Sequence, residues 1–313
     1  MPRALLVLAL LPFSFAAAQR VSPPATVQEL LIPVATAESL RVTTAGTGET
    51  VVLLPGLFGS AFGYRHLLEL LPAAGYHALV VEPLGIGRSP RPEHADYSLT
   101  AQADRVAAVL ERLHEGPVMV VAHSVGASMA LRLAYRHPEL VSSLVLLDGG
   151  PAEEAATPGF RRAMRYAPWI KWMGGVKRIR PKMRKDLIAA SGDTSWVTEE
   201  VMNGYIAGAT ADLDGTLLAF LAMSEARESE RLAPHLAEIR CPVRLVLGTA
   251  PHQGGVAPKQ VALMGAHLAL FAIDSVPGAG QYLFEEQPAS VVSIISSMMP
   301  TTPTALGVAG ATR

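Results

Sequence analysis

VMVVAHSVGASMALRLA, residues 118–134, begins as an apolar, β-branched run and continues with Met, Ala and Leu at helical spacing. Ser124 stands at the change, with Ala122 two residues before it and Gly126 two after it. A serine on such a turn is strained and needs small neighbours, as in the G-x-S-x-G pattern. The turn lifts the hydroxyl beside the free amides of a helix N-terminus, which favour developing negative charge. We therefore predict a nucleophile at Ser124 rather than a serine that only caps the helix.

Similar apolar runs recur along the chain, bounded by breakers such as Gly and Pro and separated by helical patterns. Continuous apolar strands that alternate with helices are typical of a mostly parallel sheet covered on both faces. The sequence therefore predicts an α/β doubly wound fold, in which ligands bind at the carboxyl ends of the strands. The runs lie at residues 50–56, 76–83, 117–124, 143–150, 242–248 and 268–276.

The alternation stops after the sixth strand, where about 85 residues have helical patterns and no strand pattern. An insertion of this kind is most simply a helical cap over the carboxyl ends of the strands. The predicted division of the chain is a signal peptide at 1–18, a leader at 19–36, an α/β core at 37–150 and 240–299, a helical cap at 151–239, and a disordered tail at 300–313.

The amino-terminal residues predict export. Arg3 is followed by an apolar run and then by three alanines that end at Ala18, which are the parts of a cleavable signal peptide. The apolar run is shorter than a membrane-spanning helix needs, and an uncleaved anchor is the alternative. We expect a secreted or periplasmic protein. Its single cysteine, Cys241, cannot form an internal disulfide, so the fold depends on its core.

Four further motifs occur in the order found in the α/β-hydrolase superfamily, in its cap-bearing branch. They are LLPGLFGS at 53–60, VVEPLGIGRS at 80–89, RCPVRLVLGTAP at 240–251 and VPGAGQYLFEEQP at 276–288. The resemblance implies an α/β-hydrolase fold with a helical cap after strand six. It also implies an oxyanion hole made by the backbone amides of Leu57 and Val125, and a substrate pocket beside Phe58, His123 and Gln281. Pro55 stands where the family usually has His, and Glu82 where it usually has Asp.

Two members of the family's catalytic triad are missing from their usual places. Counting from Gly248, the position of the triad acid is Pro251, and the position of the triad histidine is Gln281. A carboxamide cannot take up or release a proton near neutral pH. Loss of the base alone typically costs a serine hydrolase about a millionfold in turnover.

A rewired triad is one way to supply the missing groups. Asp148 ends the sixth strand and His252 lies on the loop after the seventh, so Ser124, Asp148 and His252 follow the chain order of the family's triad. Asp148 as a structural carboxylate and His252 as an exposed loop residue are the alternatives. His123 is a weaker candidate for the base, because a side chain next to the nucleophile normally points elsewhere.

Charge and motifs limit the partners. The 313 residues have a formal net charge of −1, which gives no general attraction to nucleic acid, and no nucleic-acid recognition motif is present. Residues 160–185 carry ten Lys and Arg with no acidic residue, interleaved with large apolar residues. This pattern fits a solvated cap surface, an apolar or anionic ester substrate, or peripheral membrane contact. No Cys or His pair has metal-ligand spacing, and we expect neither metal nor cofactor.

Three functions remain open at this point. The first is an exported serine hydrolase of carboxylester or lactone substrates that uses Ser124 with a non-standard base. The second is a non-catalytic protein of the same fold that binds a small apolar ligand or a partner under its cap. The third is a general-acid or lyase-like step with Glu82, Gln281 and Ser124 as polar contacts.

Overall fold

The computed structural model describes residues 26–164 and 175–299 of the chain. One sheet of eight strands has the order β1-β2-β4-β3-β5-β6-β7-β8. β1 and β2 are antiparallel to each other, β2 is antiparallel to β4, and the other neighbours are parallel. The strands are β1 (Gln28–Ala35), β2 (Glu38–Ala45), β3 (Glu49–Leu54), β4 (Tyr76–Glu82), β5 (Val118–His123), β6 (Val141–Leu147), β7 (Val243–Gly248) and β8 (Phe271–Val276).

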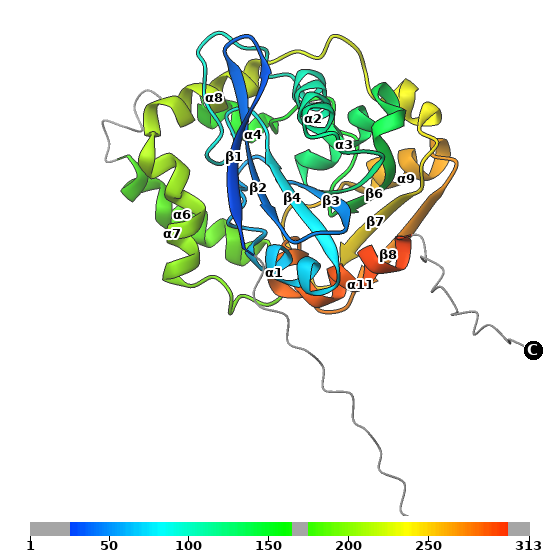
Figure 1. Ribbon diagram of the computed structural model, residues 1–313. Helices are drawn as coiled ribbons and strands as arrows, with labels where there is room; N and C mark the ends of the chain where they lie inside the picture. The colour runs from blue at the N-terminus through cyan, green and yellow to red at the C-terminus, as the bar shows by residue number, and fades with distance from the viewer. Residues whose placement is uncertain (1–25, 165–174, 300–313) are drawn as a thin grey trace, which may run out of the picture.

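Helices cover both faces of the sheet, which explains why the central strands are apolar throughout (Figure 1). α2 and α3 pack on one face together with α9, and α1 and α11 pack on the other. Every residue of β5 is buried. The bounds are α1 (Arg65–Ala73), α2 (Leu99–Leu113), α3 (Val125–Arg136), η1 (Pro138–Leu140), α9 (Pro258–His267), α10 (Leu283–Glu286) and α11 (Pro288–Met298).

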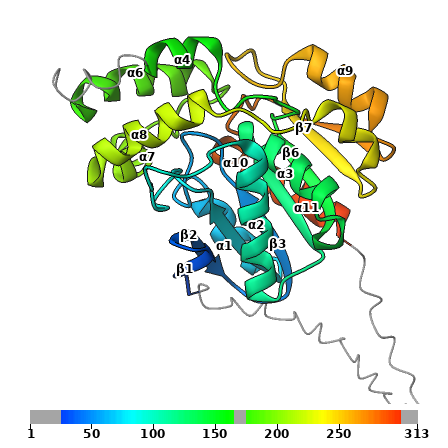
Figure 2. The same ribbon diagram turned by 90° about the horizontal axis from the view of Figure 1, so that it is seen from above.

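The chain between β6 and β7 is helical, and its described residues contain no strand. α4, α6, α7 and α8 gather at one side of the molecule, toward the left in Figure 1 and at the upper left in Figure 2, whereas η2 packs against α3 and α9. Thr198 and Asp212 cap two of them through their side chains, which bond to backbone amides inside the helix. The elements are α4 (Pro158–Met164), α6 (Val176–Ala189), α7 (Glu199–Ala211), α8 (Leu213–Glu225) and η2 (Ala233–Glu238).

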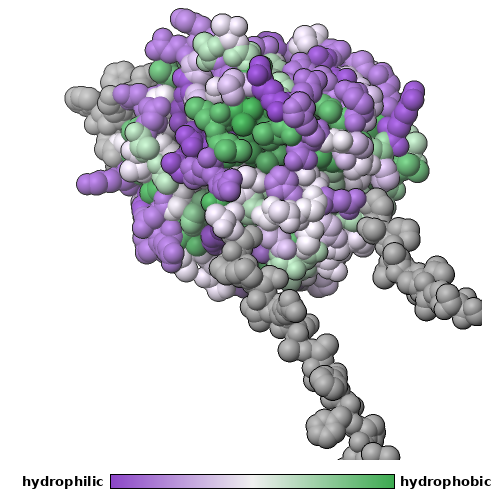
Figure 3. All heavy atoms as spheres, viewed as in Figure 1, coloured by the Kyte–Doolittle hydropathy of each residue, from purple (hydrophilic) through white to green (hydrophobic). Residues whose placement is uncertain are grey.

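The predicted leader is wrong in its second half. β1 occupies most of it and pairs with β2 along the edge of the sheet. Leu30, Ile32 and Val34 are partly buried against the core, and a hydrophobic patch lies between β1 and α2 on this face (Figure 3). Pro33 interrupts the strand pattern in the sequence, but an edge strand tolerates the missing amide donor. The signal peptide at 1–18, the start of the leader and the tail at 300–313 lie outside the described residues.

Within the described residues, no single helix has the length and apolar composition to cross a membrane, and only the sharply bent pair α7 and α8 meets that test when taken together.

Candidate active site

Ser124 has the backbone of a strained turn between β5 and α3. Its φ is 53° and its ψ is −123°, values that a residue with a side chain rarely adopts. Gly126 must be small, because a Cβ there would come within 2.8 Å of the carbonyl oxygens of Leu54 and Pro55. The strain predicted for this turn is therefore present. Strain of this kind costs about 1–3 kcal/mol and persists where the surrounding fold imposes it.

The loop after β3 lies directly against this serine. A Cβ on Gly56 would be 3.1 Å from the Cβ of Ser124, so the chain passes Ser124 just before Leu57. This places the predicted oxyanion loop beside Ser124 and the start of α3, where Val125 is the first helical residue. The pairing of the Leu57 and Val125 amides around an oxyanion stays a prediction.

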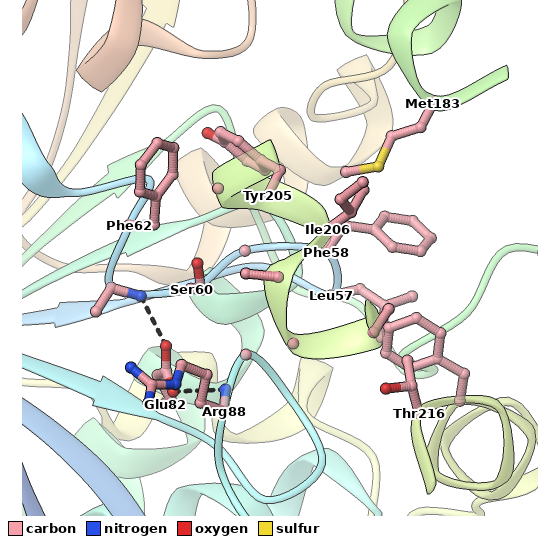
Figure 4. Close-up of a pocket in the computed structure, with 18 of the residues that line it drawn as sticks. Leu57, Phe58, Ser60, Phe62, Glu82, Arg88, Met183, Tyr205, Ile206 and Thr216 are labelled. Atoms are coloured by element: carbon pink, nitrogen blue, oxygen red, sulfur yellow. Dashed lines mark hydrogen bonds between the residues drawn. The ribbon is translucent and has the colours of Figure 1, made fainter. Parts of the chain in front are cut away.

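Glu82 holds this loop in place from the end of β4. One carboxylate oxygen accepts the amide of Ala61 at 2.8 Å and the other accepts the amide of Arg88 at 2.7 Å (Figure 4). Burial raises the pKa of the Glu82 carboxyl, and these two amides oppose that rise. Both oxygens accept backbone amides, so Glu82 braces the loop. Glu82 also borders the cavity described below, and its role as a polar contact for a ligand stays a prediction.

Asp148 and His252 meet, as the rewired triad requires. The Nε2 atom of His252 lies 3.1 Å from Oδ2 of Asp148, and Oδ1 of Asp148 accepts the amide of Val256 at 3.1 Å. Asp148 is 3% exposed, and this burial raises the pKa of its carboxyl, while the Val256 amide and His252 oppose the rise. The carboxylate thus holds the loop after β7 as well as the imidazole.

The expected contact between His252 and Ser124 is missing from the described structure. The Nδ1 atom of His252 lies 2.8 Å from the carbonyl oxygen of Ala250. A carbonyl can only accept, so Nδ1 carries a hydrogen and has no lone pair to offer a serine. With Nε2 engaged by Asp148, neither nitrogen is free. The sequence could not show this, because the competing acceptor is a backbone group of the same loop.

Gln281 follows β8 on a loop that is firmly held. The backbone amide of Gln281 donates to the carbonyl of Ala190 at 2.8 Å, and the backbone amide of Gly280 donates to the side-chain carboxylate of Glu286 at 2.9 Å. Its side chain lies against the loop after β7, since a Cβ on Gly254 would be 2.8 Å from the amide oxygen of Gln281. The loop that the resemblance identifies with the family's histidine loop is therefore bound to the end of α6 in the cap.

His123 is not an accessible base. Its ring is 5% exposed and packs between Tyr282 and Phe284, with centroid distances of 5.2 and 4.9 Å. Its Nε2 atom is buried and has no hydrogen-bond partner in the part of the chain that is described. Burial lowers the pKa of His123 from 6.5 to about 4. His123 is a core residue behind the site and does not line the pocket as expected.

Replacement of His123 by Phe should therefore change how stability depends on pH. The unfolded chain binds a proton near pH 6.5 and the folded chain only near 4, so wild-type stability falls as pH drops through this window. The loss attributable to His123 is about 3 kcal/mol. Urea unfolding at pH 7 and pH 4 should show a smaller loss in the variant by about that amount. Parallel losses in the two proteins would contradict the buried neutral imidazole.

A large cavity opens between the loop after β3 and the cap. Its volume is about 1250 Å³, and its wall is mainly apolar and aromatic. Phe58 contributes to the wall and meets Phe160 and Phe220 edge to face, at 5.5 and 5.4 Å between centroids. Leu57, which follows the glycine that lies against Ser124, and Tyr282, which packs on His123, also line the cavity. Ser124, Asp148, His252 and Gln281 do not line it.

The cavity uses residues that the sequence did not single out. Figure 4 shows Tyr205 and Ile206 from α7, Met183 from α6 and Thr216 from α8 around the same space as Phe58. The helical patterns of these residues fit ordinary burial equally well, so the sequence did not mark them as cavity residues.

The structure gives acidic partners to part of the basic segment, residues 160–185. Among its described residues, several bases pair with acids, as in Arg161 with Glu154, Lys182 with Asp186, and Arg180 and Arg184 with Glu199.

No group of three or more His, Cys, Asp or Glu side chains that could hold a metal occurs among residues 26–164 and 175–299.

The fold, the strained serine and the cap define a protein of the α/β-hydrolase class. The chain matches the alpha/beta hydrolase fold family over residues 49–251 and belongs to that family.

Several known proteins are similar to the chain. An uncharacterized protein of Mycobacterium tuberculosis is 25% identical over 280 residues, which cover 82% of this chain and 77% of the relative. A haloalkane dehalogenase of Mycolicibacterium paratuberculosis is 30% identical over 160 residues, or 48% of this chain and 53% of that enzyme.

Solved structures share the fold. The epoxide hydrolase CorEH has a TM-score of 0.73 at 20% identity, with 87% of this chain and 98% of that chain covered. A thermophilic esterase from Thermogutta terrifontis has a TM-score of 0.68 at 20% identity, with 86% and 97% covered. At this level of identity the likeness is one of fold.

Proposed function

We propose that the protein is a serine hydrolase of ester-type substrates, carboxylesters or lactones, with Ser124 as the nucleophile. The family membership and relatives named as hydrolases support a hydrolase. The observation that carries the serine mechanism is the strained turn at Ser124, with φ at 53° and a loop that can supply an amide packed against it. Strained residues of this kind cluster at active sites, where the strain is part of the mechanism.

In this mechanism Ser124 attacks the ester carbonyl, and the amides of Leu57 and Val125 stabilise the oxyanion that forms. The Asp148 and His252 pair supplies the base. For this the imidazole has to leave the Ala250 carbonyl and turn a free nitrogen toward the serine, so the resting arrangement is inactive. Catalytic hydrogen bonds are often loose or unformed before substrate binds. We therefore expect slow turnover of substrates that fit the site poorly.

A second function is favoured by a different observation. Both nitrogens of His252 are engaged and Gln281 stands at the position that the resemblance gives to the histidine, so none of the candidate residues offers Ser124 a base in this conformation. A protein of this family that binds a ligand in the cavity without turning it over would have this arrangement.

Labelling with a fluorophosphonate separates the two functions. Under the hydrolase proposal the wild type is labelled, Ser124→Ala is not, and His252→Ala is labelled at least a hundredfold more slowly, because a general base contributes about 10² to 10⁴. His267→Ala, an exposed histidine at the end of α9, is the matched control and should react like the wild type. An unlabelled wild type would favour the binding protein, and an unchanged His252→Ala rate would exclude His252 as the base.

A further inference from the structure

Charged side chains of the sheet domain border the cavity, and the structure pairs them with each other. Arg41 and Arg88 both reach the carboxylate of Glu29, at 3.2 and 2.8 Å. Arg65 donates to the buried carboxylate of Glu285 at 2.7 Å. These arginines are therefore already neutralised within the protein.

The other charged residues of the wall are satisfied in similar ways. Glu82 accepts two backbone amides, and Arg91 donates to a backbone carbonyl. Lys182 pairs with Asp186 on α6, and Glu69 is exposed to solvent. Among the described residues, the wall therefore offers no free charge to the interior of the cavity. An ionised group drawn into it would lose its water without gaining a partner, which is costly.

The cap side of the cavity is apolar and aromatic. The rings of Phe58, Phe160 and Phe220 lie 5.4–6.0 Å apart between centroids. Met164 and Met183 also line this side, and methionine can adapt to the shape of an apolar ligand. Ligand sites are usually about 300–1,000 Å³, so a cavity of about 1250 Å³ accepts a large apolar group.

Leu57 joins this apolar wall to the predicted oxyanion hole. Its side chain lines the cavity, and its backbone amide is the one expected to hold the oxyanion. Gly56, just before it, lies against Ser124. An ester carbonyl bound by the Leu57 amide would therefore have the apolar wall beside it, and a long substituent of that ester would extend into the cavity.

We propose that the cavity binds an uncharged molecule with a long apolar chain, which under the proposed function is the ester substrate. The assignment of the ester group rests on that function, whereas binding of the chain requires only the cavity. Short-chain esters would leave most of the apolar wall without contact, and each CH₂ group left out of the cavity forgoes its contribution to binding. Ionised esters would bury a charge without a partner.

Isothermal titration with unreactive analogues near neutral pH tests the proposal apart from catalysis. The probes are 1-hexanol, 1-decanol, decanoate and decylammonium, none of which contains an ester. We expect 1-decanol to bind about two hundredfold more tightly than 1-hexanol, because each buried CH₂ group is worth about fourfold in affinity. We expect decanoate and decylammonium to bind at least tenfold more weakly than 1-decanol, because neither finds a free counter-charge.

Variants that fill the cavity locate the bound chain. Ile206→Trp places a large ring in the cavity from α7, where Figure 4 shows Ile206 in the wall. It should weaken binding of 1-decanol at least tenfold and reduce the preference for it over 1-hexanol. Met183→Trp fills the same space from α6 and should do the same. Thr210→Trp is the matched control and should bind like the wild type, because Thr210 lies on α7, is exposed and does not line the cavity.

Circular dichroism of each variant shows whether it is folded. Equal affinity of the wild type for 1-hexanol and 1-decanol, a charged probe that binds as tightly as 1-decanol, or a chain-length preference that survives both folded filling variants would overturn the proposal. Titrations that behave as expected in a protein that hydrolyses no ester would uphold the proposal and contradict the proposed hydrolysis.

Discussion

Replacing Gln281 by His is expected to raise the rate of ester hydrolysis about a hundredfold. The loop that carries residue 281 is held by the backbone amide of Gln281, which donates to the Ala190 carbonyl, and by that of Gly280, which donates to the Glu286 carboxylate. Neither bond involves the side chain of Gln281. The substitution therefore places an imidazole on an unchanged mount, at the position where the family has its base. General-base catalysis contributes about 10² to 10⁴ in rate. We expect the lower end, because Pro251 leaves the new histidine without the usual carboxylate.

The measurement is hydrolysis of an activated ester, such as a p-nitrophenyl ester, by the wild type and the variant over a range of pH. The gain should appear as pH rises through about 6.5, where an ordinary imidazole becomes a free base. Gln281→Asn is the matched control and should gain nothing, and Ser124→Ala added to Gln281→His should remove the gain. A rate equal to that of the wild type would mean that Ser124 lacks more than a base, which would favour the binding protein.

Replacing Arg132 by Met is expected to lower the free energy of unfolding by about 3–5 kcal/mol, the usual cost of breaking a buried charge pair from one side. The Arg132 side chain on α3 is fully buried. It donates to the Ser128 hydroxyl at 2.7 Å and the Ala152 carbonyl at 3.0 Å, and lies 3.4 Å from the nearly buried carboxylate of Glu228. The variant removes the guanidinium from the nearly buried Glu228 carboxylate, which keeps only its bonds from Leu99 and Thr100.

Urea unfolding near neutral pH measures the loss. Arg136→Met on the same helix is the control, because Arg136 pairs with Asp104 and Glu230 near the surface and such pairs are worth about 0–1 kcal/mol. Arg132 also ties α3 to Ala152, four residues past Asp148, so the variant should disturb the end of β6 as well. Losses of similar size in the two variants would show that the buried network adds no special stability.

The order of strands and helices could be predicted from the sequence because each element carries its own periodic signal. The strained turn at Ser124 could be predicted for a similar reason, since Ala122 and Gly126 flank the serine in the sequence. The sequence did not predict β1, because Pro33 interrupts its strand pattern. Its pairing with β2 shows that β1 is an edge strand, where a proline is tolerated.

The candidate site was only partly predictable. Chain order and strand ends were enough to bring Asp148 toward His252, and the two side chains do meet. They were not enough to orient the imidazole, whose second nitrogen is taken by the carbonyl of Ala250. Ring orientation depends on which acceptors lie within about 3 Å, and no pattern of residue types contains that information.

By itself, the sequence determined the α/β-hydrolase architecture and predicted the strained turn at Ser124 between a strand and a helix. These follow from local patterns and from spacing along the chain. Only the tertiary structure decided that His252 is engaged by Asp148 and by the carbonyl of Ala250, and that a large apolar cavity opens beneath the cap. Both depend on distances between groups far apart in the sequence, and those distances exist only once the cap is packed on the sheet.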